Sequence, residues 1–173
     1  MTFRYCPRCA TELELRPSSG PDPDRPTCPN CGFVHYENPT PTVQAWIDDD
    51  GSYLALRRGE EPLKGEWNMP GGFVEVGERG DEAIVREVAE ETGLEIEVVE
   101  LIGIFDSTYG SGDDAKAIFD VAYRCRITGG DAGELDVSDE SSEARWFPLA
   151  EFPDPAFAGE RKALARLREM TPQ

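Results

Sequence analysis

The segment 72–94 constrains the fold more than any other part of the 173-residue chain, because its residues are spaced as in an amphipathic helix. At about 100° per residue, three glutamates fall within one arc of about 100°: Glu87, Glu90 and Glu91. The roughly opposite side is apolar: Ile84, Val85, Val88 and Ala89. The pattern predicts a helix over 81–92 that ends at Gly93 and packs its apolar side on a sheet.

The three glutamates can be interpreted in two ways. Carboxylates three and four positions apart repel one another by roughly 0.2–0.5 kcal/mol per pair. A cation offsets that repulsion, and hard oxygen ligands at this density suit Mg²⁺ or Mn²⁺. In so acidic a chain, a solvated acidic face is the alternative. Two neighbours favour a metal site: Arg86, which can orient a glutamate, and Pro70-Gly71-Gly72, which lets the backbone approach a ligand closely.

Two Cys-x-x-Cys pairs, Cys6/Cys9 and Cys28/Cys31, are separated by eighteen residues. This spacing is typical of a zinc ribbon, in which four thiolates hold one structural Zn²⁺ and leave no position open for catalysis. A redox Cys-x-x-Cys is one alternative, but it needs one pair beside a helix rather than two pairs. A nucleic-acid-binding ribbon is another, but it needs a basic surface, which residues 1–38 lack.

The remaining cysteine and the only histidine add little chemistry. Cys125 lies on an apolar strand face, so we expect a buried packing residue. His35 is expected at the surface or at a hinge rather than as a fifth metal ligand. With one histidine outside the other motifs, Ser–His or Cys–His nucleophilic catalysis is poorly supported.

The charge is unevenly distributed. The whole chain has a formal net charge of −18, whereas residues 1–38 hold four basic and five acidic residues. Such a surface repels nucleic acid and anionic membranes, so neither is an expected partner. The scattered acidic excess and the scarcity of lysine predict a halophilic host. No apolar run resembles a signal sequence or a membrane span, so a cytoplasmic location is expected.

The pattern along the chain predicts an α/β protein with two domains. Residues 1–38 form the zinc ribbon, with a loop over 16–27, and residues 39–173 form the larger domain after a stiff linker over 38–41. Periodicity predicts strands over 42–47, 53–57, 95–105, 116–127 and 145–147, and a closing helix over 156–170.

The segment 72–94 resembles the signature of the Nudix hydrolases, GX5EX7REUXEEXGU, where U is a bulky apolar residue. Every defined position is filled: Gly72, Glu78, Arg86, Glu87, Val88, Glu90, Glu91, Gly93 and Leu94. The resemblance covers about residues 40–150. It implies a Nudix α/β/α sandwich around a mixed sheet, here preceded by a small zinc ribbon.

The resemblance also implies an activity and a set of metal ligands. Nudix hydrolases cleave a nucleoside diphosphate linked to another group, with Mg²⁺ or Mn²⁺. Glu87 and Glu91 are then metal ligands, Glu90 supports them or binds a further ion, and the carbonyl of Gly71 adds a ligand. The cation neutralises the diphosphate and lowers the pKa of the attacking water.

Further roles follow from the same resemblance. Arg86 orients a glutamate, and Glu78 caps and braces the unit of loop and helix. The general base is open between Glu87 and the acidic loop 138–143, in which Glu143 is slightly favoured over Glu140.

Residues outside the signature are candidates for substrate binding. Arg57, Arg58 and Lys64 precede it and could hold substrate phosphates, or they could be ordinary surface charges. Tyr109 is placed somewhat like the tyrosine of dinucleoside polyphosphate hydrolases, or it could be a packing aromatic.

The pairing of a four-cysteine ribbon with this signature resembles the NADH pyrophosphatase group, in which homodimers are common. The segment that marks relatives cleaving NADH is absent here. We therefore expect ADP-ribose or another nucleoside diphosphate sugar as substrate, then NADH-like dinucleotides, then nucleoside triphosphates. The alternatives are a non-catalytic nucleotide-binding regulator on a Nudix fold and a zinc-ribbon nucleic-acid adaptor.

Overall fold

The computed structural model describes residues 3–17, 20, 23–112 and 115–171 of the chain. It divides into two units, Met1–Pro39 and Thr40–Gln173. No helix among the described residues is long and apolar enough to cross a membrane.

The smaller unit is built around a short antiparallel pair of strands, β1 (Glu14–Arg16) and β2 (Arg25–Thr27), in which Leu15 lies opposite Pro26. The loop predicted over 16–27 is therefore shorter than expected, and part of it lies outside the described residues. Proline lacks the N–H that would pair on a second side, so it is tolerated in a strand with one neighbour.

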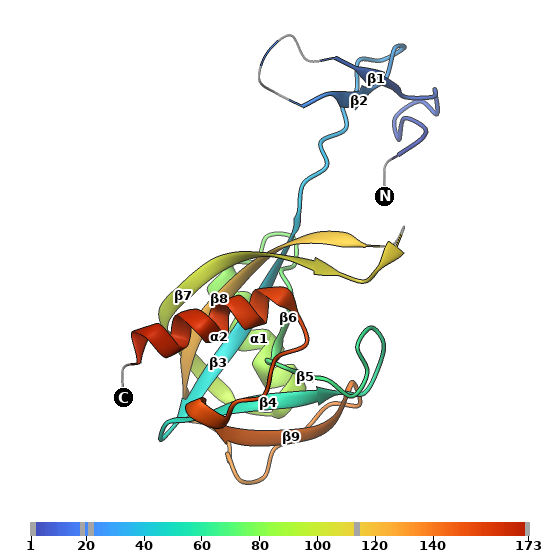
Figure 1. Cartoon of the computed structure of the whole chain (residues 1–173). Helices are drawn as coiled ribbons and strands as arrows, with labels where there is room; N and C mark the ends of the chain where they lie inside the picture. Colours follow the sequence, from blue (N-terminus) through green and yellow to red (C-terminus); the bar gives the residue numbers. More distant parts are fainter. Residues whose placement is uncertain (1–2, 18–19, 21–22, 113–114, 172–173) are drawn as a thin grey trace. The chain divides into compact units, whose positions relative to one another are not determined.

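The larger unit contains a mixed sheet. Its strands are β3 (Thr40–Asp49), β4 (Ser52–Arg58), β5 (Trp67–Asn68), β6 (Gly71–Phe73), β7 (Glu95–Tyr109), β8 (Lys116–Gly129) and β9 (Ser141–Pro148). The order is β5-β4-β3-β8-β7, with β6 paired to β3 and β9 paired to β4. The β3–β8 pair is parallel and the other pairs are antiparallel, so β3 joins most of the sheet together (Figure 1).

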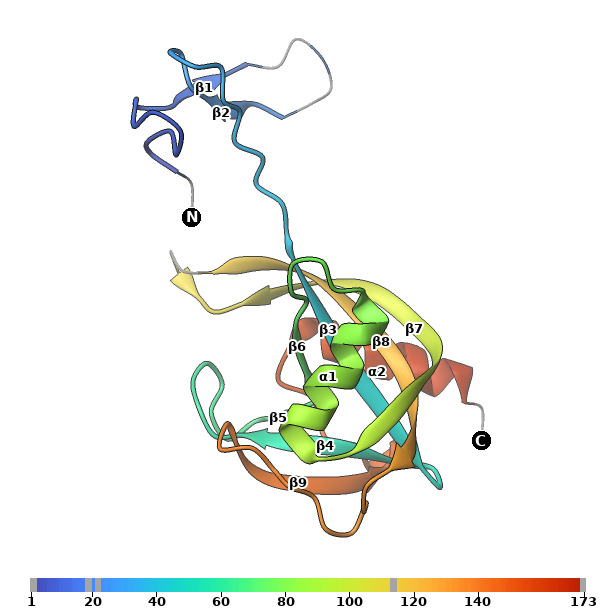
Figure 2. The ribbon, with the colours of Figure 1, turned by 180° about the vertical axis from the view of Figure 1, so that it is seen from behind.

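Two helices cover the two faces of this sheet. Helix α2 (Ala158–Met170) crosses the face seen in Figure 1, and α1 (Gly80–Thr92) crosses the face seen in Figure 2. A 3₁₀ turn, η2 (Leu149–Glu151), leads from β9 toward α2. This arrangement is the α/β/α sandwich predicted from the sequence.

Each face has its own apolar core. Ile84 and Val88 of α1 pack with Val43 and Ile47 on one face, together with the buried Cys125, as predicted for that cysteine. On the other face, the core is formed by Trp46, Tyr53, Ala163, Leu164 and Leu167 among others. Because both faces are covered, the middle of β3 is buried on both sides.

Helix α1 ends where its sequence predicts. Gly93 adopts a left-handed conformation (φ 71°), and its N–H donates to the carbonyl of Ala89. A glycine takes this conformation without steric cost, so it stops the helix before β7. At the other end, the backbone N–H of Arg79 donates to the side chain of Glu82.

The predicted linker over 38–41 is partly wrong. Thr40 and Pro41 already belong to β3 and lie opposite Ile118 and Phe119 of β8. Proline has no N–H to donate, but at the start of a strand its backbone can still follow the extended path.

Candidate active site

The glycine-rich loop, which consists of Pro70 and the first two residues of β6, Gly71 and Gly72, lies against the glutamate side of α1. The N–H of Gly71 donates to Glu91 Oε2 at 2.9 Å. Gly71 has φ 151°, and a Cβ at this position would lie 2.1 Å from the carbonyl oxygen of Val43. Any side chain here would force β6 away from β3, so glycine is required for this contact with Glu91.

Gly72 provides the space for the second glutamate. A Cβ on Gly72 would lie 2.6 Å from Glu87 Oε1. The carboxylate of Glu87 therefore packs directly on the backbone of β6. The two glycines bring Glu87 and Glu91 to one loop, which explains why this segment contains no larger residue.

Arg86 connects the carboxylates of this site. Its Nε and Nη2 donate to the two oxygens of Glu78 at 2.8 and 3.0 Å, and Nη2 also donates to the carbonyl of Phe73 at 3.2 Å. Its Nη1 donates to Glu87 at 2.9 Å and to Glu90 at 3.2 Å. The guanidinium thus fastens the loop before the helix to two residues of the helix, and a planar fork of five donors is suited to this task.

The carboxylates differ in their electrostatic surroundings. Burial, which is the largest cause, and the neighbouring carboxylates of Glu87 and Glu140 together raise the pKa of Glu91 to about 8, and the hydrogen bond from the N–H of Gly71 opposes this rise. Burial also raises the pKa of Glu87, against the hydrogen bond from Arg86. The hydrogen bond from Arg86 lowers the pKa of Glu78 to about 2. A carboxylate with a raised pKa gains most from a nearby cation, so this donor set fits a divalent metal ion.

The three glutamates of the helix are not equivalent. Glu87 and Glu91 face the glycine loop, whereas Glu90 is exposed and contacts Arg86. Among the described residues, only the four cysteines of the smaller unit form a group whose ligand atoms all lie within 4.8 Å of one another.

An open pocket of about 550 Å³, counting its solvent-filled mouth, adjoins Glu91. Its lining is mostly polar: Arg58, Glu60, Glu61, Asn68, Glu91, Tyr109, Glu140 and Ser141. Glu140 therefore lies in the same pocket as Glu91. Glu143 does not line it and forms ion pairs with Arg57 at 3.4 Å and Arg145 at 3.8 Å.

The three basic residues considered for phosphate binding have different surroundings in the structure. Arg58 lines the pocket beside Glu91 and donates to the carbonyl of Pro62 at 2.6 Å. Arg57 donates to the carbonyl of Gly65 and pairs with Glu143. Lys64 is exposed and lines neither pocket described here.

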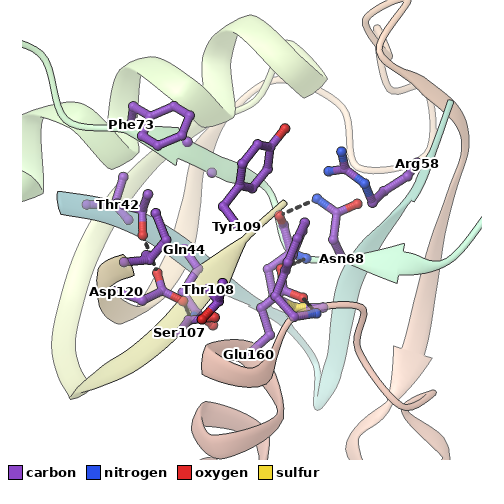
Figure 3. A pocket seen from close by; sticks show the side chains of 16 residues that line it. Thr42, Gln44, Arg58, Asn68, Phe73, Ser107, Thr108, Tyr109, Asp120 and Glu160 are labelled. Carbon is purple, nitrogen blue, oxygen red and sulfur yellow. Dashed lines mark hydrogen bonds between the residues drawn. The ribbon is translucent and has the colours of Figure 1, made fainter. Parts of the chain in front are cut away.

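A second open pocket, of about 540 Å³ with its mouth, lies between β3, β6, β7, β8 and the start of α2 (Figure 3). Tyr109, Arg58 and Asn68 line both pockets, so the two are adjacent. The Asn68 side chain donates to the carbonyl of Met69 at 3.0 Å.

Sequence reasoning missed four buried polar residues of this second pocket: Gln44, Asn68, Asp120 and Glu160. The contact between Gln44 and Asp120 and the contact of Glu160 with Met69 join segments far apart in the sequence, so no local spacing indicates them. A charged residue at an otherwise apolar strand or helix position was the one available signal, and it fits Asp120 in β8 and Glu160 in α2.

Glu160 joins the start of α2 to the glycine-rich loop. Its Oε1 accepts the N–H of Met69 at 3.0 Å, and its Oε2 accepts the N–H of Phe157 at 3.1 Å. The N–H of Ala156 donates to the carbonyl of Trp67 nearby. Burial raises the pKa of Glu160 to about 8, against these backbone hydrogen bonds.

The four cysteines of the smaller unit lie together as free thiols. Cys6 and Cys31 have their sulfurs 3.6 Å apart, and Cys9 and Cys28 have theirs 3.5 Å apart. These distances exceed a disulfide bond and suit four thiolates around one tetrahedral ion. His35 is not part of the group, and its ring packs edge-on against Phe3.

A mixed sheet between two helices, with a glutamate-rich helix fastened to a glycine loop, is the architecture of a Nudix hydrolase. The NUDIX domain model matches residues 38–167 and the Nudix N-terminal model, which describes a zinc ribbon, matches residues 4–37. The chain therefore belongs to the Nudix family. It is a Nudix pyrophosphohydrolase preceded by the zinc ribbon of the Nudix N-terminal family.

Individual relatives agree with this assignment. The chain is 36% identical to an ADP-ribose pyrophosphatase of Methanocaldococcus jannaschii, over 73% of this chain and 72% of the relative. It is 29% identical to the NAD-capped RNA hydrolase NudC of Pseudomonas aeruginosa, over 87% of this chain but 49% of that relative. A NUDIX hydrolase structure from Nitrosomonas europaea superposes with a TM-score of 0.77 at 26% identity, covering 98% of this chain and 95% of that one.

Proposed function

We propose that the protein hydrolyses the diphosphate bond of a nucleoside diphosphate derivative with Mg²⁺ or Mn²⁺. ADP-ribose or another nucleoside diphosphate sugar is the first choice of substrate, ahead of NADH-like dinucleotides and nucleoside triphosphates. The observation that carries the proposal is the partly buried Glu91, which accepts the N–H of Gly71 and lies beside Glu87. The similarity to the Methanocaldococcus jannaschii ADP-ribose pyrophosphatase supports the choice of substrate.

The residues that would hold the divalent ion are Glu87 and Glu91, with the carbonyl of Gly71 and with Glu90 as a supporting or additional ligand. When bound, the ion supplies charge neutralisation of the diphosphate and a lowered pKa for the attacking water. Arg86 keeps Glu87 in place through its hydrogen bond at 2.9 Å.

For the general base, Glu140 is the stronger candidate of the acidic loop. Its position in the pocket of Glu91 supports this role, whereas Glu143, favoured from the sequence, is engaged by Arg57 and Arg145. Arg58 lines the same pocket and is the candidate for binding a substrate phosphate. Tyr109 remains a candidate for contact with the substrate.

Three further properties belong to the proposal. The four cysteines bind one structural Zn²⁺, which their sulfur separations support. The enzyme works in a salt-rich cytoplasm, which its net charge of −18 supports, and without nucleic-acid or membrane partners. A homodimer is the assembly to test first, by light scattering.

The deciding experiment is a substrate panel with Mg²⁺ and with Mn²⁺, followed by product analysis. Glu87→Gln and Glu91→Gln should each lower kcat at least 100-fold. The matched control is Glu169→Gln at the end of α2, where Glu169 pairs only with Arg166 among the contacts described. Wild-type turnover in both active-site variants would refute the site.

A further inference from the structure

Asp120 is a buried acid in the second pocket, and its neighbours leave it as a hydrogen-bond acceptor. It is 6% exposed, and it accepts from the hydroxyl of Thr42 at 3.0 Å and from Nε2 of Gln44 at 2.6 Å. An ionised carboxylate has about four acceptor positions, so two uncharged donors do not saturate it.

The orientation of the Gln44 amide is fixed from behind. The indole N–H of Trp46 donates to Gln44 Oε1 at 2.8 Å, and both side chains are buried. Since the amide oxygen faces Trp46, the amide nitrogen must face Asp120. Because the amide cannot flip, its oxygen cannot face Asp120. The carboxylate of Asp120 therefore remains the acceptor in this hydrogen bond.

Asp120 also lies against the start of α2. A Cβ on Gly159 would lie 2.3 Å from Asp120 Oδ2, so glycine is needed at this point of the helix. Burial raises the pKa of Asp120, and the hydrogen bonds from Thr42 and Gln44 oppose this rise. The positive end of the helix dipole also favours the ionised form. The two side-chain partners of Asp120 in the described part of the chain, Thr42 and Gln44, are both uncharged.

The opposite part of the pocket is aromatic. Tyr109 stacks on Phe157 with ring centroids 5.7 Å apart, and Phe73 meets Tyr109 edge-on at 5.7 Å. Figure 3 shows Asp120 and Thr42 on one side of the pocket and Arg58 and Asn68 on the other, with Tyr109 between them. Aromatic side chains in one part of the pocket and a buried acceptor in another suit a planar ring that has an N–H donor at its edge.

We propose that this pocket binds the base of the nucleotide and that Asp120 selects bases with an exocyclic amino group. The proposal rests on the proposed function for the identity of the ligand as a nucleotide. Tyr109 and Arg58 line both pockets, so one ligand can place its diphosphate beside Glu91 and its base beside Asp120. Because a buried carboxylate with two donors still has acceptor positions to fill, a ligand that supplies an N–H donor should bind more tightly than one that lacks it.

The test uses two pairs of nucleoside monophosphates that differ only by one amino group. Adenosine is compared with purine riboside, and guanosine with inosine, all as 5′-monophosphates. Affinities are measured by calorimetry on the full chain, without turnover. We expect the amino group to strengthen binding about 10-fold or more in at least one pair, and Asp120→Asn to remove most of that difference. Asp106→Asn is the matched control, because Asp106 is exposed on the neighbouring strand.

A second variant keeps the test informative if Asp120→Asn does not fold. Phe73 is 37% exposed, so Phe73→Ala should fold, and it should weaken all four nucleotides while leaving their ratios unchanged. Phe119→Ala is its control, since Phe119 is similarly exposed and does not line the pocket.

The outcomes separate this inference from the proposed function. Equal affinities within both pairs overturn it, as does discrimination that a folded Asp120→Asn retains, or full affinity in Phe73→Ala. Absence of hydrolysis together with amino-group selectivity refutes the proposed function and leaves the base site standing. Hydrolysis without amino-group selectivity refutes the base site and leaves the proposed function standing.

Discussion

The carboxylate of Glu160 in α2 accepts the backbone N–H of Met69 at 3.0 Å, two residues before Gly71. Gly71 in turn donates its N–H to Glu91 of α1 at 2.9 Å. The short loop that lies beside the proposed metal ligands is therefore held by one carboxylate from each helix, of which Glu160 is buried and Glu91 partly buried. Displacement of either helix end would move this loop.

Glu160→Gln should destabilise the protein by about 1–3 kcal/mol, because the amide nitrogen would face a backbone N–H and one buried donor would lose its acceptor. Chemical denaturation measures the free energy of unfolding. Glu169→Gln, on the exposed side of the same helix, should change it by less than about 0.5 kcal/mol. Equal stability of Glu160→Gln and wild type would contradict the bracing role.

Arg86→Lys should lower kcat at least 10-fold with a smaller effect on stability. An ammonium group is a point charge and cannot hold Glu78 in a two-point contact while also reaching Glu87. Steady-state kinetics and circular dichroism would measure the two effects. Arg166→Lys, which alters an exposed pair with Glu169, is the control, and identical kinetics for both variants would count against the role of Arg86.

The stability of the metal-free protein should fall as pH rises from about 5 to about 8. Glu91 and Glu160 have ordinary pKa values of 4.5 that burial raises to about 8, so the folded state holds protons that the unfolded state has released in this window. Thermal denaturation in a chelator across this range measures the slope, and the difference between wild type and Glu91→Gln isolates the share of Glu91. Mg²⁺ should stabilise more at pH 8 than at pH 5.5, since it competes with the proton. A rising or flat profile would be inconsistent with these pKa directions.

Cys28→Ser should abolish stoichiometric zinc, which we expect at one atom per chain in the wild type. Elemental analysis measures the metal, and hydrogen exchange should show faster exchange in residues 3–39 only. Cys125→Ala is the matched control, because Cys125 lies in the other unit and is buried among apolar residues. Unchanged zinc in Cys28→Ser would exclude it as a ligand.

Added KCl should raise the melting temperature. The chain has 35 acidic and 17 basic residues, and at 1 M salt charges are screened beyond about 3 Å. Melting curves recorded from about 0.05 to about 3 M KCl measure how the melting temperature depends on salt. A melting temperature that stays constant or falls would refute adaptation to high salt.

Local patterns were sufficient for the framework of the fold. The period of α1 and its stop at Gly93 predicted the helix within one residue, because both depend on neighbours along the chain. Thr40 and Pro41 were assigned to a linker because turn formers surround them. Their place in β3 depends on β8, about 78 residues later in the chain, and no local pattern reports such pairing.

In the candidate site, too, some residues could be predicted from local sequence and others could not. The positions of Glu87 and Glu91 follow from one helix, whereas the contacts of Glu160 and Asp120 cross 91 and 76 residues. The choice between Glu140 and Glu143 depends on which side of a short loop faces Glu91. Sequence spacing does not carry that information, and we propose Glu140 ahead of Glu143 because Glu140 lines the pocket of Glu91.

The parallel pairing of Thr40 and Pro41 with β8 has a practical consequence for anyone who wishes to study the catalytic unit alone. A truncation within the proline-rich stretch would remove the first residues of β3, the strand that pairs with β4, β6 and β8. The safe place to shorten the chain is on the N-terminal side of Pro39, where the contacts of the larger unit have not yet begun.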